Sequence, residues 1–547
     1  MNYLPLLLAI TSLCTPLTAQ ELPELLQTAV EGVITVETKK YSYDQELTFD
    51  ADQPWSLTLT TTRSGLKKGS GDPVTYSFNL ADIDGRLINY EDDRTEQTVV
   101  LKTKRKLDVI RRTDADGDVS YDDEVVIWSP EIDHATQLRD ALRAAAPLAE
   151  AAWVAAFQPG ATLPELSSWL TKNITGVTTE DGAIDVSWVP DGDLTDYATL
   201  SVTDEDGERR AYYLSLADVA TNSVGLSIKG DEVTVELGMV GRQAIIRESE
   251  AGVITDYVDE VEIPVAGVDE ARYLMQVLTT AVPLAVKVRK ARFTEPTNLE
   301  IAQAHLLKAV NRPSLLAEGP VVTLAPGLTP VLTLRSGEGD DSEENRFLFH
   351  YADLNPASVK IDAKGEQLYV EVKTARKRDF VQEWEDDEEE GFMDELVVPV
   401  ADLEAARALE ILLPYVIEAA AQIPVAPEAF GWLAGAVAAG STEEVQQSLT
   451  EGETCKWTLV VTEDGKKTNE ITYDFNLYNI DARRLEIEAG RRGVELQLQT
   501  LKQEKIINVL EDGEPEFTDE LTIRFVDLAS AKTGLATVRA LVEACSE

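Results

Sequence analysis

The 547-residue sequence is poor in the side chains that most often carry catalysis and metal binding, because it has only three histidines and three cysteines. It contains no H-E-x-x-H, G-x-S-x-G, P-loop or paired-cysteine spacing. These shortages exclude the common zinc, serine-nucleophile and nucleotide-phosphate sites. We expect a protein that is not an enzyme and needs no cofactor, although carboxylates alone could still support an acid-only hydrolase.

Basic residues are also scarce, with 49 Lys and Arg against 98 Asp and Glu and a net charge of −49. Nucleic-acid binding needs clustered cations that displace counterions from the phosphates. This charge balance therefore excludes nucleic acid as a partner. We expect most of the acids to lie on a solvated surface, which would favour solubility.

Long apolar runs are absent apart from one at the start of the chain. The segment from Leu4 to Cys14, followed by the candidate cleavage site Leu17-Thr18-Ala19, is typical of a secretory signal peptide. No later segment reaches the roughly 18 apolar residues that a transmembrane helix needs. We predict a signal peptide over residues 1–19, no transmembrane segment, and a mature protein that is periplasmic or secreted.

Two cysteines remain after this segment, Cys455 and Cys545. The first precedes an expected strand and the second ends an expected helix. Cysteines of exported proteins usually pair. We therefore predict a Cys455–Cys545 disulfide that stabilises the fold by about 2–4 kcal/mol; two buried free thiols are the alternative.

What the sequence does contain is a fourfold repeat. A signature of alternating aromatic and apolar residues, ending in Asp-apolar, begins at Tyr76, Tyr212, Phe347 and Tyr473. Its recurring polar residue is Asp82, Asp218, Asp353 and, in the last copy, Asn479. An Asp-Glu-apolar mark follows 41 residues later, or 40 in the last copy, at Asp123, Asp259, Asp394 and Asp519. Chance does not keep such marks in register, so we predict four repeat modules, at residues 20–150, 151–286, 287–423 and 424–547.

Each module combines strand-like and helix-like periodicity. Tyr76, Phe78 and Leu80 alternate with polar residues, as in a half-buried antiparallel strand. Asp-Gly turns separate such runs. After the last strand the apolar spacing becomes helical, with Asp133 as the expected N-cap in the first module. Shorter helices are expected before each sheet, at residues 22–30, 163–170, 299–310 and 443–449.

The predicted fold class is therefore α+β: four tandem repeats, each a bent antiparallel sheet of about six strands with a short leading helix and a C-terminal helix. A bent sheet closed at one end by a C-terminal helix resembles the pleckstrin-homology-type superfold. The resemblance concerns architecture alone, and fold does not imply function.

The recurring acids are expected to serve the fold rather than a ligand, because every module carries them. An Asp at the end of a strand commonly accepts backbone N–H bonds. The acidic loop of the first module is a candidate for weak Ca²⁺ binding, since oxygen-rich loops hold this ion. Its candidate ligands are Asp114, Asp116, Asp118 and Asp123.

Basic hairpin tips stand out in so acidic a chain. They contain Lys102, Lys104, Arg105 and Lys106 in the first module and Lys373, Arg376, Lys377 and Arg378 in the third. These cations could bind an acidic partner, or they could pair with acids of the protein itself, which the surrounding negative charge favours.

The leading functional hypothesis is an exported, non-enzymatic protein that acts as a binding or scaffold element at the cell envelope. Its partner would be an unidentified protein or envelope polymer, contacted weakly by several modules. One alternative is a carrier of small apolar ligands, held against aromatics such as Tyr76, Phe78 and Tyr90. The acid-only hydrolase is the other alternative.

Overall fold

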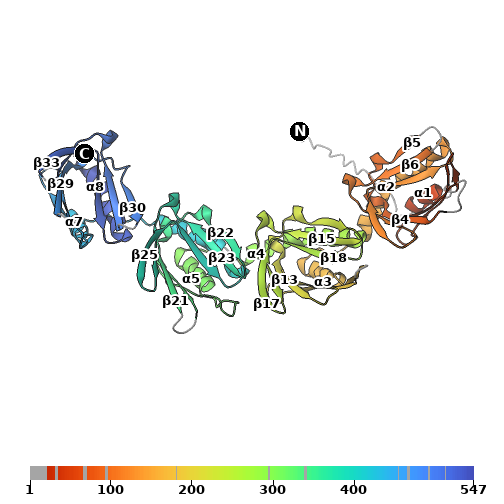
Figure 1. Cartoon of the computed structure of the whole chain (residues 1–547), viewed down its shortest axis with the longest axis horizontal. Helices are drawn as coiled ribbons and strands as arrows, with labels where there is room; N and C mark the ends of the chain where they lie inside the picture. Colours follow the sequence, from red (N-terminus) through yellow and green to blue (C-terminus); the bar gives the residue numbers. More distant parts are fainter. Residues whose placement is uncertain are drawn as a thin grey trace, which may run out of the picture. The chain divides into compact units, whose positions relative to one another are not determined.

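The computed structural model describes residues 21–30, 35–65, 71–92, 97–179, 182–293, 296–337, 342–453, 455–464, 468–490, 493–511 and 513–546. The predicted signal peptide lies outside these residues. The described chain is α+β, with eight helices and mostly antiparallel sheets, which confirms the α+β part of the predicted fold class. The sheets recur in groups, which we call sets 1 to 4 (Figure 1).

Set 1 runs from the first to the second helix. Its elements are α1 (Glu21–Val30), β1 (Val36–Glu37), β2 (Tyr41–Phe49), β3 (Ser56–Gly65), β4 (Pro73–Asn79), η1 (Leu80–Asp82), η2 (Gly85–Leu87), β5 (Asn89–Asp92), β6 (Gln97–Lys102), η3 (Lys104–Lys106), β7 (Ile110–Thr113), β8 (Val119–Asp122), β9 (Glu124–Ser129) and α2 (Ile132–Ala156).

Set 2 has the same element order. It comprises α3 (Leu163–Asn173), β10 (Val177–Thr178), β11 (Ala183–Pro190), β12 (Tyr197–Thr203), β13 (Arg209–Ser215), η4 (Leu216–Asp218), η5 (Thr221–Ser223), β14 (Gly225–Lys229), β15 (Glu232–Gly238), η6 (Val240–Arg242), β16 (Ile246–Glu250), β17 (Val253–Val258), β18 (Glu260–Val265) and α4 (Val268–Arg292).

Set 3 lacks the short first strand. It comprises α5 (Leu299–Val310), β19 (Val321–Leu324), β20 (Val331–Ser336), β21 (Glu343–Leu348), η8 (Tyr351–Asp353), η9 (Pro356–Ser358), β22 (Lys360–Lys364), β23 (Gln367–Lys373), η10 (Ala375–Lys377), β24 (Val381–Glu385), β25 (Glu388–Met393), β26 (Glu395–Val400) and α6 (Leu403–Ala421).

Set 4 has the strand and helix order of set 3, with one 3-10 turn instead of two between its third and fourth strands. It comprises α7 (Phe430–Ala439), β27 (Val445–Glu451), β28 (Lys456–Asp464), β29 (Thr468–Asn476), η11 (Leu477–Asn479), β30 (Glu486–Gly490), β31 (Gly493–Gln499), η12 (Leu501–Gln503), β32 (Ile507–Glu511), β33 (Glu514–Thr518), β34 (Glu520–Phe525) and α8 (Leu528–Ser546).

Each set contains two antiparallel sheets where the sequence predicted one bent sheet. In set 1 the strand orders are β1-β2-β3-β4-β7-β8 and β5-β6-β9, and the other sets repeat them with six or five strands in the first sheet and three in the second. The chain changes sheets at the η turns, because two short 3-10 turns separate β4 from β5 and a third separates β6 from β7. The hydrogen-bonded ladders are therefore interrupted at these turns.

Contacts divide the chain into two compact units, which we describe separately. Unit 1 comprises residues 1–242, 246–253 and 258–290, and unit 2 comprises residues 243–245, 254–257 and 291–547. Sets 1 and 2 make up most of unit 1. Sets 3 and 4 lie in unit 2.

The core of each set lies between its sheets and its helices. In set 1, α1 packs on α2, and apolar side chains of both helices and both sheets form one buried cluster. The buried residues of α2 recur at helical spacing, so one stripe of this helix faces the sheets. They are Ala135, Leu138, Leu142, Ala145, Ala146 and Ala149.

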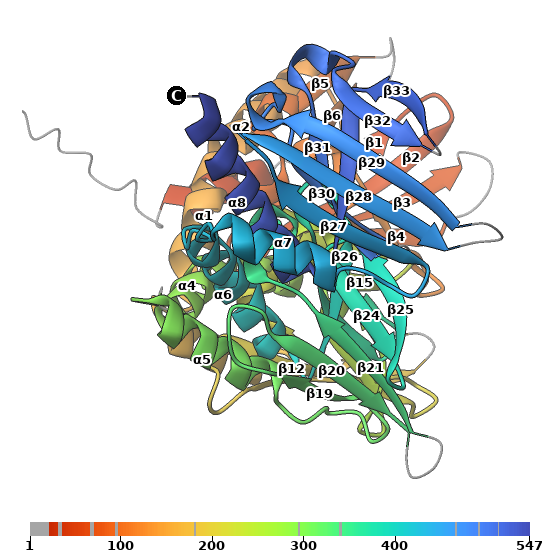
Figure 2. The ribbon, with the colours of Figure 1, turned by 90° about the vertical axis from the view of Figure 1, so that its left-hand side faces the viewer.

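Figure 2 shows α7 and α8 of set 4 next to each other, and α8 also contacts β30 and β31. The leading helix of this set is not where the sequence placed it. The prediction of a helix at residues 443–449 is wrong, because Val445, Gln447 and Leu449 are buried alternately, as in the strand β27. The helix forms earlier, in the Ala- and Gly-rich segment of α7. The other three predicted leading helices coincide with α1, α3 and α5.

The predicted N-cap of the first trailing helix is also wrong by two residues. Glu131 occupies the cap position of α2, and Asp133 lies within the first turn, where its charge favours the positive end of the helix dipole. In α6, by contrast, Asp402 is the N-cap and accepts a hydrogen bond from the backbone N–H of Ala405 at 2.7 Å.

A buried glutamine joins the two sheets of sets 1 and 4. The side-chain amide of Gln447 donates to the carbonyl of Arg524 at 2.7 Å and accepts from its N–H at 3.1 Å. Gln45 makes the same two bonds with the backbone of Trp128, each at 2.9 Å. Because β27 and β34 belong to different sheets, this amide replaces a missing backbone ladder between them.

We expect Gln447→Leu to lower the unfolding free energy of the protein by about 2–3 kcal/mol, because it leaves the backbone N–H and carbonyl of Arg524 without the partners that Gln447 provides. Denaturant unfolding and hydrogen exchange of β34 measure the loss. The matched control is Gln446→Leu at the neighbouring exposed position, which should change stability little. Equal effects of the two variants would contradict the proposed role of Gln447.

Candidate functional site

In sets 1 and 3, the recurring Asp of the signature forms an ion pair with the next set. In unit 1, Asp82 at the end of η1 contacts Arg272 in the first turns of α4. In unit 2, Asp353 at the end of η8 contacts Lys532 in the first turns of α8. The side chains of both pairs are at most 18% exposed. The same carboxylate position therefore links two sets in each unit.

The neighbours of Arg272 extend this link into a network. Its guanidinium also donates to Asp269 Oδ1 at 2.8 Å, and this oxygen accepts a second bond from Asn79 Nδ2 at 3.1 Å. Burial raises the pKa of Asp82 from its ordinary value of 3.8 to about 7, although the positive charge of Arg272 opposes this shift. The carboxyl is therefore protonated in part of the molecules at neutral pH.

The other two recurring residues lie at the same turn but have different partners. Asp218 pairs with Arg289 of α4 in its own set. Asn479, which carries no charge, ends η11 in set 4. The turn itself is capped by the residue that precedes it: Asn79, Ser215, His350 and Asn476 each accept a bond from a backbone N–H two residues on. The recurring Asp is thus not the Asx-turn residue that the sequence indicated.

The second recurring acid acts through its backbone. The carbonyls of Asp123, Asp259, Asp394 and Asp519 accept bonds of 2.8–2.9 Å from Thr103, Met239, Thr374 and Thr500, respectively. These four donors begin the tips that follow β6, β15, β23 and β31. The acid mark therefore fixes the base of each tip to the last strand of the set.

The basic tips have an unusual backbone that recurs in every set. Two consecutive residues adopt positive φ at each tip, namely Arg105 and Lys106, Gly241 and Arg242, Arg376 and Lys377, and Lys502 and Gln503. Left-handed conformations are costly for side chains other than glycine. Three tips are held by a buried threonine, whose hydroxyl donates to the carbonyl four residues on, as in Thr103 to Leu107 at 2.7 Å.

Half of the predicted binding cations at the tips pair within the protein. Lys102 contacts Glu124 at 2.8 Å, and Lys104 contacts Glu150 at 3.0 Å. In unit 2, Lys373 contacts Glu395 at 3.8 Å and Arg378 contacts Glu486 at 2.5 Å. The remaining four, Arg105, Lys106, Arg376 and Lys377, are exposed and form no ion pair within the described part of the chain.

The predicted calcium residues form a hairpin turn. Asp114 Oδ1 accepts backbone N–H bonds from Asp116 and Asp118, both at 3.0 Å, and Gly117 has a φ of +97°. Asp123 lies beyond β8, before β9. Among the described residues, the one acidic triple with ligand atoms close together is Glu236, Glu260 and Glu262. Glu262 already pairs with Lys229 at 2.8 Å.

Two of the three histidines, His134 and His350, have local partners that fit a structural role. His134 Nδ1 lies 2.7 Å from the Ser129 hydroxyl. His350 Nδ1 accepts the backbone N–H of Ala352 at 3.1 Å, and burial lowers the pKa of His350. A neutral ring is therefore favoured at this turn.

The predicted disulfide is confirmed. Cys455 and Cys545 are bonded, with their Cα atoms 6.0 Å apart. The bond joins the start of β28 to the last turn of α8 and closes a loop with a sequence separation of 90. The bond therefore encloses β28 to α8 of set 4, whereas α7 and β27 lie outside the loop.

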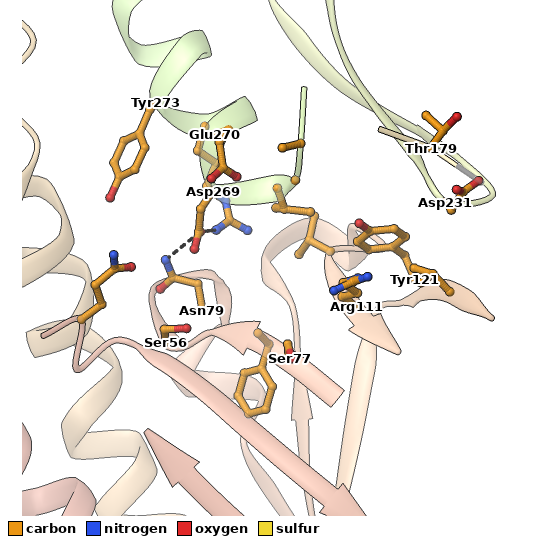
Figure 3. A pocket seen from close by; sticks show the side chains of 18 of the residues that line it. Ser56, Ser77, Asn79, Arg111, Tyr121, Thr179, Asp231, Asp269, Glu270 and Tyr273 are labelled. Atoms are coloured by element: carbon orange, nitrogen blue, oxygen red, sulfur yellow. Dashed lines mark hydrogen bonds and ion pairs between the residues drawn. The ribbon is translucent and has the colours of Figure 1, made fainter. Parts of the chain in front are cut away.

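Unit 1 contains a polar cleft between sets 1 and 2, shown in Figure 3, with a volume of about 570 Å³. Arg111 on β7 and Tyr121 on β8 lie side by side on one wall. Asn79 and Asp269 meet on another wall, and Thr179 and Asp231 of set 2 lie across from them. Hydroxyl groups of Ser56 and Ser77 complete the floor.

Several polar groups of this cleft have no partner within the part of the chain that the structure describes. The Arg111 guanidinium is exposed and forms no ion pair there, and the hydroxyls of Ser56, Ser77 and Tyr121 form no hydrogen bond there. Burial raises the pKa of Tyr121, so its hydroxyl stays protonated at neutral pH and can donate. The cleft therefore offers both donors and acceptors to a ligand.

A second cavity of about 620 Å³ lies within set 1. It is lined by the stacked pair Tyr43 and Trp128, by Tyr76 and by charged residues including Arg112 and Asp122. The other two aromatics of the carrier hypothesis lie elsewhere: Phe78 is part of the core, and Tyr90 packs against it. This cavity therefore presents charges beside its aromatic rings.

No family model, curated protein or solved structure matches the chain. Within the described residues, none of the helices has the length and apolar character needed to cross a membrane. The functional argument therefore depends on the geometry above.

We expect Arg272→Met to destabilise unit 1 by about 3–5 kcal/mol at pH 8, because it leaves the buried Asp82 carboxylate without a counter-charge. The loss should be smaller at pH 5, where Asp82 is protonated. A carboxyl whose pKa is raised by folding stabilises the fold fully below its ordinary value of 3.8 and loses that contribution as the pH rises through about 7.

Calorimetry of the whole protein at the two pH values, with hydrogen exchange at the start of α4, measures this difference. The control is Arg210→Met, which removes the partner of Glu250 from an exposed pair of the same unit and should change stability little at either pH. A loss that is independent of pH would contradict the role of Asp82 protonation.

Replacing both Cys455 and Cys545 by Ser should lower the stability of set 4 by about 2–4 kcal/mol, because the closed loop restricts the unfolded chain. Hydrogen exchange should accelerate in α8 and β28 and stay unchanged in set 1. Reduction of the wild-type protein should reproduce the effect, and reduction of the double variant should add nothing. Unchanged exchange in set 4 would contradict this prediction.

Proposed function

We propose that this chain is an exported, non-enzymatic protein that acts as a binding or scaffold element at the cell envelope. The observation that carries the proposal is the ion pair at the same position in both units, Asp82 with Arg272 and Asp353 with Lys532. Each pair couples one sheet-and-helix set to the next. A chain built this way presents several binding surfaces on sets that are joined in pairs, which suits multivalent contact.

The finer architectural proposal is that the four sets are copies of one module, over residues 20–150, 151–286, 287–423 and 424–547. The recurring strand order, the η turns and the positive-φ tips support this view. Each module would resemble the pleckstrin-homology-type superfold in having strongly bent β-structure closed by a trailing helix. Repetition of a structural unit is itself a common basis for binding arrays.

Export is supported by two independent features. Residues 1–19 have the pattern of a signal peptide, and the Cys455–Cys545 disulfide suits an oxidising compartment. The mature protein would be periplasmic or secreted. Its partner would be a protein or polymer of the envelope.

The non-enzymatic role is supported by where the acids lie. The second recurring acid serves the tips through its carbonyl, and the first pairs with a cation at each link described above. A pair of carboxylates in a hydrolase must instead face the scissile bond across one cleft.

The proposal is tested by expressing the full chain in its source cells and fractionating them. We expect a mature protein that begins at Gln20, lies outside the cytoplasm and sediments with isolated envelope fragments. The control is the same protein after unfolding, which should not sediment with the fragments. An intact N-terminus in the cytoplasm would contradict export, and a folded protein that ignores the fragments would contradict envelope binding.

A further inference from the structure

The cleft of unit 1 has a counterpart at the equivalent boundary in unit 2, between sets 3 and 4. The recurring marks give the register: Thr103 corresponds to Thr374, and Asp123 to Asp394. By this register the cleft residues Ser77, Val109, Arg111 and Tyr121 of set 1 correspond to Leu348, Phe380, Gln382 and Phe392 of set 3, which line the counterpart. The correspondence of Asp259 in set 2 with Asp519 in set 4 likewise aligns Asp269 of the cleft with Ala529 of the counterpart.

The counterpart is nearly filled. Its volume is about 100 Å³, against about 570 Å³ for the cleft of unit 1. Phe380 is only 6% exposed and belongs to the core cluster of set 4, and Phe392 packs against the same cluster. Apolar side chains can therefore fill the boundary between two consecutive sets, and their burial stabilises the interface.

The polar lining of the cleft in unit 1 is thus not a requirement of the link between sets. Arg111 and Tyr121 replace Gln382 and Phe392, and Val109 leaves open the space that Phe380 occupies. The ion pair to the trailing helix is kept in both units. A large open cleft with polar groups is what a binding site for a small polar molecule needs.

The chemistry of the lining indicates the class of ligand. Most of its polar side chains are neutral groups that donate and accept hydrogen bonds, and the acids Asp231, Asp269 and Glu270 can accept from hydroxyl groups. Arg111 can donate to a ring or hydroxyl oxygen. Because the acids outnumber the cations in the cleft and the protein carries a net charge of −49, an anionic ligand is disfavoured.

We propose that the cleft between sets 1 and 2 binds a neutral oligosaccharide, with Arg111, Tyr121 and Asn79 among its contacts. This inference rests on the binding role proposed above and names the class of envelope material that unit 1 recognises. Hydroxyl groups of a sugar ring both donate and accept, which matches the unpartnered hydroxyls of Ser56, Ser77 and Tyr121.

The test uses the mature full-length protein and three neutral trisaccharides, maltotriose, cellotriose and chitotriose, with trigalacturonate as the anionic probe. Calorimetric titration should give a dissociation constant between about 10 µM and 1 mM for at least one neutral probe. The variant Val109→Phe, Arg111→Gln, Tyr121→Phe introduces the residues of the counterpart and should weaken binding at least about tenfold.

Two further variants keep the result interpretable. Tyr121→Phe alone removes one hydroxyl and should weaken binding of the same probe without lowering the melting temperature. Gln382→Arg, at the position of unit 2 that corresponds to Arg111, should leave binding unchanged.

The proposal is overturned if no neutral probe binds, if trigalacturonate alone binds, or if the triple variant binds as tightly as the wild type. The envelope sedimentation of the triple variant separates this inference from the proposed function. Sedimentation that persists when trisaccharide binding is lost places envelope binding on another surface, whereas failure of the wild type to sediment counts against the proposed function itself.

Discussion

The buried pair between an acid of one set and a cation of the next is the interaction on which the described arrangement of each unit depends. Asp82 and Asp353 both end a 3-10 turn between the two sheets of a set, and their partners Arg272 and Lys532 both lie in the first turns of a helix. A buried ion pair contributes less to stability than to specificity of position, because desolvation offsets most of its attraction. Its main effect is to fix which face of the helix meets the turn.

The same turn also positions residues that line the cleft of unit 1. Asn79 caps η1 and at the same time donates to Asp269, which also binds Arg272. The residues that hold the link are therefore the residues that form one wall of the cleft (Figure 3). A ligand in the cleft would contact this network directly, so binding and the coupling of the two sets depend on shared side chains.

The repeat marks and the periodicity of apolar residues were enough to predict the α+β class and three leading helices. The disulfide was predicted from the two cysteines that remain after the expected signal peptide. The repeat marks and the periodicity were not enough to separate the two sheets of a set, because period-two alternation is the same in both sheets. The segment at 443–449 was misread as a helix since its three buried positions, Val445, Gln447 and Leu449, include a polar residue whose burial depends on Arg524, far along the chain. The partners of Asp82 and Asp353 were equally hidden, because they lie 190 and 179 residues away. The cleft itself leaves one signal in the sequence, the exchange of Phe380 and Phe392 for Val109 and Tyr121 at equivalent positions.

The disulfide gives the four sets unequal mechanical properties. Under tension along the backbone, a set without a crosslink can unravel to its full contour length, whereas the segment between Cys455 and Cys545 cannot lengthen at all while the bond is intact. About 300 Å of extended chain is thereby withheld. No other pair of cysteines exists in the sequence beyond residue 14, so sets 1 to 3 would yield to such a load while Cys455 and Cys545 of set 4 keep their Cα atoms 6.0 Å apart.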